Sequence, residues 1–189
     1  MTETDLSDDR EAVPAGVVPR SLPPFDDEGF LPPHEGERMV RMGSCAPYRI
    51  SLETLTQRFG TTPRRLELCE GLRKHRAALH ELGIVTGFQW VGGSFLTVSE
   101  REPSDIDVVT FFAAPPALAT RDALQELSRA RPDVFLPTRA RETFGVDAYF
   151  VRLKMSHQTF RSLTLWYALF SHDRPTGRWK GFVELGLAP

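Results

Sequence analysis

The sequence predicts one α/β domain, of the α+β kind, in which helices flank a mixed β-sheet and an extended proline-rich arm precedes the domain. Runs of β-branched and aromatic residues alternate along the chain with segments whose apolar residues recur at helical spacing. This alternation is typical of a sheet covered by helices. The length of 189 residues and the apolar fraction of 41% suit one buried core and an extension.

The first 48 residues are expected to lie outside the main body of the domain. Residues 1–20 are polar and acidic and are predicted to be disordered. Residues 21–48 are predicted to form an extended arm, because two Leu-Pro-Pro units favour a polyproline-type path. The arm is either a structural strap on its own domain or a proline-rich motif that binds a partner.

The domain itself, residues 49–189, shows both helical and strand patterns. Helices are predicted over 51–59, from Thr62 to Gly83, from the residues after Pro116 to about 130, and over 157–170. Strands are predicted within 84–95, 104–112, 145–153 and 182–187, and residues 133–144 are expected to form a strand and a loop. His75 lies in an apolar helical stripe and is either a ligand or a core histidine.

The composition argues against several classes of protein. A formal net charge of -2 provides no basic excess for extended nucleic-acid binding. No apolar run approaches the roughly 18 residues of a membrane span, and the acidic N-terminus does not resemble a signal peptide. Cys45 and Cys69 are expected to be reduced thiols without metal-ligand spacing to a histidine, so a cytoplasmic protein is predicted.

A glycine-rich turn follows the first predicted strand of the 84–112 region. Gly92 and Gly93 let the backbone turn sharply and let an anion approach main-chain N–H groups, and Ser94 adds a hydroxyl donor. Glycine pairs also mark ordinary turns. On its own, this feature therefore indicates only a candidate phosphate contact.

Two aspartates open the next predicted strand. Because side chains alternate between the faces of a strand, Asp105 and Asp107 point to the same side, about 6.6 Å apart along the backbone. Two like charges on one face favour a divalent cation between them, and Mg²⁺ prefers oxygen ligands. The alternative is a solvated strand end, where aspartates are common.

Asp147 lies in an otherwise apolar predicted strand, where an unpaired carboxylate is costly. If that strand neighbours the strand of Asp107, about 4.8 Å away, Asp147 completes a cluster of three carboxylates. The alternative is an ion pair with a nearby base such as Arg152 or Lys154.

Together these features resemble a known signature. Gly-Gly-Ser, ten intervening residues, Asp-Ile-Asp and a later strand aspartate are similar to the pattern of the DNA polymerase beta-type nucleotidyltransferases. The Leu-Pro-Pro arm and the stretch over 176–185 are also similar to small bacterial nucleotidyltransferase-like proteins without an assigned substrate. The resemblance implies a minimal nucleotidyltransferase fold, because little chain remains after Asp147 for a second, helical domain.

The resemblance implies a role for each motif residue. Gly92, Gly93 and Ser94 would hold the phosphates of a nucleoside triphosphate such as ATP. Lys180 is a further candidate phosphate ligand, beside Arg174 and Arg178, unless these cations belong to a solvated basic loop. Trp166 and Trp179 are candidates for stacking on a base or, alternatively, for packing.

The carboxylates would carry the metal chemistry. Asp105 and Asp107 would bind Mg²⁺, or Mn²⁺ in its place, and Asp147 would complete a two-metal site and help to activate an acceptor hydroxyl. The expected function is transfer of a nucleoside monophosphate to a protein, RNA or small-molecule hydroxyl. The alternative is a non-catalytic or partner-dependent subunit, such as an antitoxin-like or antiviral-defence regulator, by analogy with other small proteins of this kind.

Overall fold

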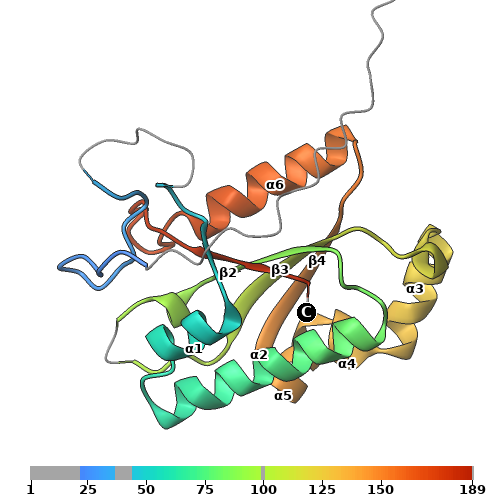
Figure 1. The fold of residues 1–189 in the computed structure, drawn as a ribbon, viewed down its shortest axis with the longest axis horizontal. Coiled ribbons are helices and arrows are strands. Elements are labelled where there is room, and N and C mark those ends of the chain that lie inside the picture. Colours follow the sequence, from blue (N-terminus) through green and yellow to red (C-terminus); the bar gives the residue numbers. More distant parts are fainter. Residues whose placement is uncertain (1–21, 37–43, 99–100, 189) are drawn as a thin grey trace, which may run out of the picture.

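The computed structural model describes residues 22–36, 44–98 and 101–188 (Figure 1). Within them, five strands form one mixed sheet in the order β1-β5-β2-β3-β4. Strand β3 runs antiparallel to β2 and parallel to β4. The strands are β1 (Tyr48–Ile50), β2 (Gly87–Gly92), β3 (Ile106–Phe112), β4 (Val146–Arg152) and β5 (Val183–Gly186). The predicted disordered tail, residues 1–20, lies outside the described residues.

Helices cover both faces of this sheet, which confirms the predicted fold class. Helix α6 lies on one face, and α1, α2, α4 and α5 lie on the other (Figure 1). The helices are α1 (Leu52–Phe59), α2 (Pro63–Glu81), α3 (Arg121–Ala130), α4 (Pro132–Phe135), α5 (Pro137–Phe144) and α6 (His157–Phe170), with single 3-10 turns at Ser94–Leu96 and Pro116–Leu118. Helices α1, α2, α3 and α6 each begin behind a serine or threonine whose side chain accepts a backbone N–H bond.

The segment over 133–144 corrects a prediction. It was expected to form a strand and a loop, whereas it forms most of the short helices α4 and α5. Pro132 and Pro137 each occupy the first position of a helix, where the missing N–H carries no penalty. Gly145 ends α5 with a φ of 68°. Val134 is buried in the core, and a short apolar run of this kind does not distinguish a strand from a helix.

The C-terminal end of the arm leads into the sheet. Strand β1 pairs in parallel with β5, with Tyr48 opposite Val183, and forms one edge of the sheet. The Tyr48 hydroxyl donates a hydrogen bond of 2.8 Å to the carbonyl of Pro32. Leu31 is fully buried in the main core. Between residues 22 and 36 the arm therefore packs along its own domain, as a structural strap does.

His75 lies in the core and not at a ligand site. Its Nε2 is 3.1 Å from the carbonyl oxygen of Val134, and its ring packs edge-on against Phe144 at 5.5 Å between centroids. Its Nδ1 has no hydrogen-bond partner among the described residues. Burial lowers the pKa of His75 to about 4, against the opposing effect of the Val134 carbonyl.

This burial predicts an acid-sensitive core. Between pH 6.5 and about 4 the unfolded chain binds a proton at His75 that the native state rejects, so stability falls as the pH falls through this window. The effect is on the order of 3 kcal/mol. Chemical denaturation at pH 7 and pH 4.5 measures it in the wild type and in His75→Phe. The variant should lose less stability between the two values, and equal losses would contradict this account.

Candidate functional site

The sheet brings the three aspartates together. Asp107 of β3 and Asp147 of β4 are direct partners in the register of two parallel strands. Asp105 comes immediately before β3, two residues from Asp107. All three carboxylates therefore lie at the end of the sheet where β3 and β4 begin, and the pairing of β4 with β3 meets the condition under which Asp147 was expected to join the other two.

An arginine lies between two of these carboxylates. Nε of Arg141, on α5, is 2.9 Å from Oδ2 of Asp105, and its Nη2 is 2.8 Å from Oδ2 of Asp147. The Tyr149 hydroxyl donates a further bond of 3.3 Å to Oδ2 of Asp147. The ion pair of Asp147 is thus formed with Arg141 and not with Arg152 or Lys154, the partners considered from the sequence.

Among the described residues, Asp107 forms no such ion pair, and its ionisation is unfavourable. Burial raises the pKa of Asp107, and the charges of Asp105 and Asp147 raise it further, against the opposing charges of Arg174 and Arg141. The charges of Asp105 and Asp147 therefore repel a negative charge at Asp107, in addition to the cost of its burial. A cation that approached Asp107 would relieve this repulsion.

The three carboxylates are chemically suited to Mg²⁺, although their side chains are not arranged to bind it in this structure. Across the described ranges, no three His, Cys, Asp or Glu side chains are arranged so that they could hold a metal ion. The guanidinium of Arg141 lies between Asp105 and Asp147, at the place where a shared cation would neutralise both. The three carboxylates are nevertheless hard oxygen donors of the kind that Mg²⁺ selects.

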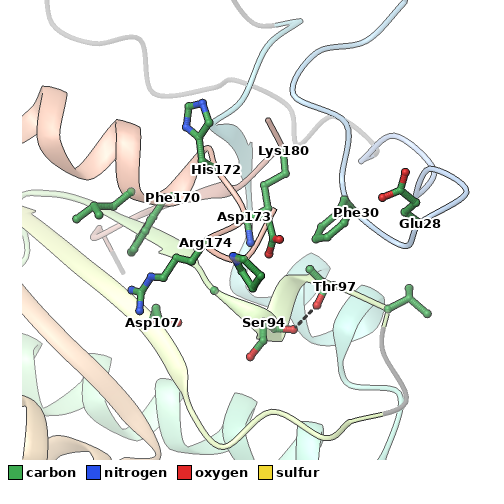
Figure 2. Close-up of a pocket in the computed structure, with 14 residues that line it drawn as sticks. Glu28, Phe30, Ser94, Thr97, Asp107, Phe170, His172, Asp173, Arg174 and Lys180 are labelled. Carbon is green, nitrogen blue, oxygen red and sulfur yellow. Dashed lines mark hydrogen bonds between the residues drawn. The ribbon is translucent and has the colours of Figure 1, made fainter. Parts of the chain in front are cut away.

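A cavity of about 460 Å³ opens beside Asp107 (Figure 2). Its volume lies within the usual range of small-molecule sites. Asp105 and Asp147 are not among the residues that line it, so Asp107 is the aspartate through which the cluster meets the cavity. The lining residues come from the arm, the turn after β2, β3 and the chain around the end of α6: Glu28, Phe30, Gly93, Ser94, Thr97, Val98, Asp107, Leu169, Phe170, His172, Asp173, Arg174, Pro175 and Lys180.

The glycine-rich turn forms one wall of this cavity. Gly93 has a φ of 77° and Ser94 follows it, exposed in the cavity wall. Ser94 begins a single 3-10 turn, in which its carbonyl accepts a hydrogen bond of 2.8 Å from the Thr97 hydroxyl (Figure 2). Gly92 is buried instead, and a side chain there would overlap the ring of Phe170. Gly93 and Ser94 therefore face the cavity, whereas Gly92 serves close packing.

Gly93 is the residue of the turn that tolerates substitution least. A Cβ at Gly93 would overlap Oδ2 of Asp107, and the positive φ disfavours any side chain. We expect Gly93→Ala to lower stability by about 2–4 kcal/mol, since it combines backbone strain with displacement of the half-buried carboxylate of Asp107. Gly177→Ala is the matched control, because Gly177 has a φ of 68° and no atom within 4 Å of the added Cβ. Denaturation midpoints would compare the two, and equal losses would show that the clash with Asp107 is absent.

Two cations, Arg174 and Lys180, line the same cavity as Asp107. Figure 2 shows the side chain of Arg174 directed toward Asp107. Lys180 is buried, and burial lowers its pKa while the charges of Asp173 and Asp107 oppose that shift. No carboxylate of the described residues lies within salt-bridge distance of Lys180. Lys180 is therefore an interior cation in the cavity wall, and the alternative of a solvated loop residue does not hold for it.

Other candidates have different roles. Arg178 pairs with Asp26 at 2.9 Å and with Glu28, so it attaches the arm to the loop after α6. Trp166 packs against Tyr149 at 4.7 Å between centroids, and Trp179 lies edge-on to His34. Neither tryptophan lines the cavity.

The sequence analysis did not identify Arg141 or Phe30 as site residues. Arg141 lies in the segment that was predicted as strand and loop, and Gly145 as a helix C-terminus was the signal that could have revealed α5. Phe30 belongs to the arm, and no local pattern connects it with Ser94 or Asp107.

Comparison with known proteins gives a family but no activity. The sequence model of a family of unknown function (DUF6932) matches residues 23–186, which include the arm, the sheet and every residue of the cavity named above. No curated protein and no solved structure gives a significant match. None of the helices in the described ranges has the length and apolar character that crossing a membrane requires.

Proposed function

We propose that this chain, which belongs to the DUF6932 family of unknown function, is a Mg²⁺-dependent nucleotidyltransferase that takes a nucleoside triphosphate into the cavity beside Asp107. One observation carries the proposal. Asp107 and Asp147 lie in register on neighbouring strands, with Asp105 beside them, at the edge of a cavity that also presents Ser94 and the buried Lys180. The order of these motifs also resembles that of the DNA polymerase beta-type nucleotidyltransferases.

The cavity residues suit the triphosphate of such a donor. The hydroxyl of Ser94 can donate to a phosphate oxygen, and Gly93 leaves the backbone open to close approach. Arg174 and Lys180 would neutralise phosphate charge from the opposite side, where desolvation of Lys180 strengthens the attraction. Binding of this kind orients the α-phosphorus, and orientation is a large part of phosphoryl-transfer catalysis.

The proposed reaction transfers a nucleoside monophosphate. An acceptor hydroxyl oxygen forms a bond to the α-phosphorus, the bond from that phosphorus to the bridging oxygen breaks, and pyrophosphate leaves with the electron pair. The proton of the acceptor hydroxyl passes to the carboxylate of Asp147. Asp105, Asp107 and Asp147 would hold Mg²⁺, which supplies charge neutralisation at the attacking and leaving oxygens. The acceptor is a hydroxyl of a protein, an RNA or a small molecule.

Calorimetric titration of each ribonucleoside triphosphate into the wild-type protein, with and without Mg²⁺, tests the proposal. We expect at least one triphosphate to bind, and to bind more tightly with Mg²⁺ present. Release of labelled pyrophosphate in the presence of candidate acceptors would then identify the reaction. If no triphosphate binds under either condition, the enzyme assignment is wrong.

A second candidate function is a partner-dependent subunit of the antitoxin-like or defence-regulator kind. It is favoured by α6, which exposes Phe160 and Leu165 by 56% and 57%, and by Met155, just before the helix, which is almost fully exposed. Large exposed apolar side chains are a feature of surfaces that bind a partner. The same titrations separate the candidates, because a subunit without nucleotide chemistry gives no Mg²⁺-dependent signal.

A further inference from the structure

The N-terminal arm is fastened to both sides of the cavity mouth. The carbonyl of Gly29 accepts a bond of 2.8 Å from the N–H of Val98, in the turn after β2. On the other side, the carbonyl of Leu31 accepts a bond of 2.6 Å from Gly181, and Asp26 pairs with Arg178. The arm from Asp26 to Leu31 therefore connects the turn after β2, which holds Ser94, with the loop after α6, which holds Lys180.

Hydrogen bonds within the arm also fix its conformation. Oδ1 of Asp26 accepts backbone bonds of 3.0 Å from Glu28 and 2.9 Å from Phe30, which closes a turn that presents the Phe30 ring. Leu31, the next residue, is buried in the core and anchors that turn. Phe30 is consequently a positioned aromatic side chain, since its backbone is fixed on both sides.

Phe30 forms the aromatic end of the cavity. Figure 2 shows Phe30 and Glu28 on one side of the cavity and Asp107 and Arg174 on the other, with Ser94 below and Lys180 above. The ring centroid of Phe30 is 5.7 Å from Nζ of Lys180, so the ring also borders the cation. The Asp107 end of the cavity thus offers charge and a hydroxyl, and the Phe30 end offers an aromatic ring beside Glu28 and Lys180.

This division matches the two parts of a nucleotide, which has an anionic chain at one end and a flat aromatic base at the other. We propose that Phe30 stacks on the nucleobase of the triphosphate, so that the arm supplies the base-binding wall of the cavity. Stacking on an aromatic ring is sequence-tolerant and adds affinity for any base. The inference rests on the proposed function, because it assigns the base end of the site whose phosphate end is described above.

The test compares whole nucleotides with their phosphate chain alone. The four ribonucleoside triphosphates and inorganic tripolyphosphate are titrated with Mg²⁺ into the wild type and Phe30→Leu, which keeps an apolar side chain to hold the arm. We expect nucleotide binding to weaken by about tenfold in the variant, while tripolyphosphate binding stays unchanged. Phe160→Leu is the control, because Phe160 is exposed on α6 and lies outside the cavity.

The outcomes separate this inference from the proposed function. Equal nucleotide affinity in the wild type and Phe30→Leu overturns the stacking role while leaving the phosphate site intact. An equal loss for nucleotide and tripolyphosphate also overturns it, because the substitution would then act only by moving the arm. If the wild type binds neither a nucleotide nor tripolyphosphate, the proposed function is wrong, and the stacking role of Phe30 is wrong with it.

A spectroscopic variant gives an independent readout. Phe30→Trp places an indole at the proposed base wall, and stacking of a base should quench its fluorescence relative to the wild type. Tripolyphosphate should produce no such change. Equal quenching by both probes would show that the base does not reach residue 30, and the inference would be wrong.

Discussion

Asp107→Asn is expected to make the protein more stable at neutral pH while ending Mg²⁺-dependent nucleotide binding. Burial and the charges of Asp105 and Asp147 raise the pKa of Asp107 in the native state. The protonated carboxyl of Asp107 therefore stabilises the native state. This stabilisation is full below the ordinary pKa of 3.8 and is lost as the pH rises through the raised pKa of the native state. Asparagine carries no charge and avoids that loss.

We expect the gain to be on the order of 1 kcal/mol at pH 7, or about 2–4 °C in Tm for a chain of this size. The gain should disappear as the pH falls below the ordinary pKa of 3.8, where the carboxyl is protonated in the native and unfolded states alike. Triphosphate affinity in the presence of Mg²⁺ should fall by about 100-fold or more, since a proposed metal ligand and much of the charge at the cavity edge are removed.

Thermal denaturation at several pH values and calorimetry with Mg²⁺ and nucleotide measure the two effects. Asp122→Asn is the control, because Asp122 is exposed in the first turn of α3 and does not line the cavity. It should not raise Tm and should bind nucleotide normally. A lower Tm for Asp107→Asn at pH 7 would show that its charge is compensated in the native state, and unchanged nucleotide affinity would remove Asp107 from the site.

Arg141→Gln is expected to have the opposite effect on stability. The substitution leaves Asp105 and Asp147 without their shared cation. We expect a loss of about 1–2 kcal/mol at pH 7, a value limited by solvent screening because the Arg141 side chain is 49% exposed. The loss should be reversed by millimolar Mg²⁺ at pH 7.

The same variant should bind divalent cations more tightly. In the wild type a cation that enters the cluster competes with the Arg141 guanidinium, whereas glutamine offers no charge. An increase in Mn²⁺ affinity of about tenfold corresponds to about 1.4 kcal/mol. Calorimetric titration with Mn²⁺ alone measures it without nucleotide or activity.

Arg139→Gln provides the matched control for Arg141. Arg139 lies on the same helix and pairs with Glu142 at 2.8 Å on the exposed surface. Its substitution should change stability by a few tenths of a kcal/mol and leave Mn²⁺ affinity unaltered. If the two variants behave alike, Arg141 is an ordinary surface arginine and not the counter-ion of the aspartate cluster.

Features that depend on residues close together in the sequence could be predicted from the sequence. Ser51 and Thr62 indicated two helix starts through their capping side chains, and both are observed. Alternation placed Asp105 and Asp107 toward one side of a strand, and an aspartate in an apolar strand indicated that Asp147 needed a partner. The partner itself was not predicted, because the short apolar run over 134–136 suggested a strand and obscured the helix after it, which carries Arg141.

The sequence by itself therefore determined the alternation of elements, the caps and the presence of carboxylates on two strands, since these depend on periodicity and on bonds between residues a few positions apart. The tertiary structure decided which charges meet. Register between β3 and β4 brought Asp107 beside Asp147, the packing of α5 brought Arg141 between Asp105 and Asp147, and the arm brought Phe30 to the cavity. These contacts depend on the register of the strands and on the packing of distant segments, and no local pattern in the chain specifies either.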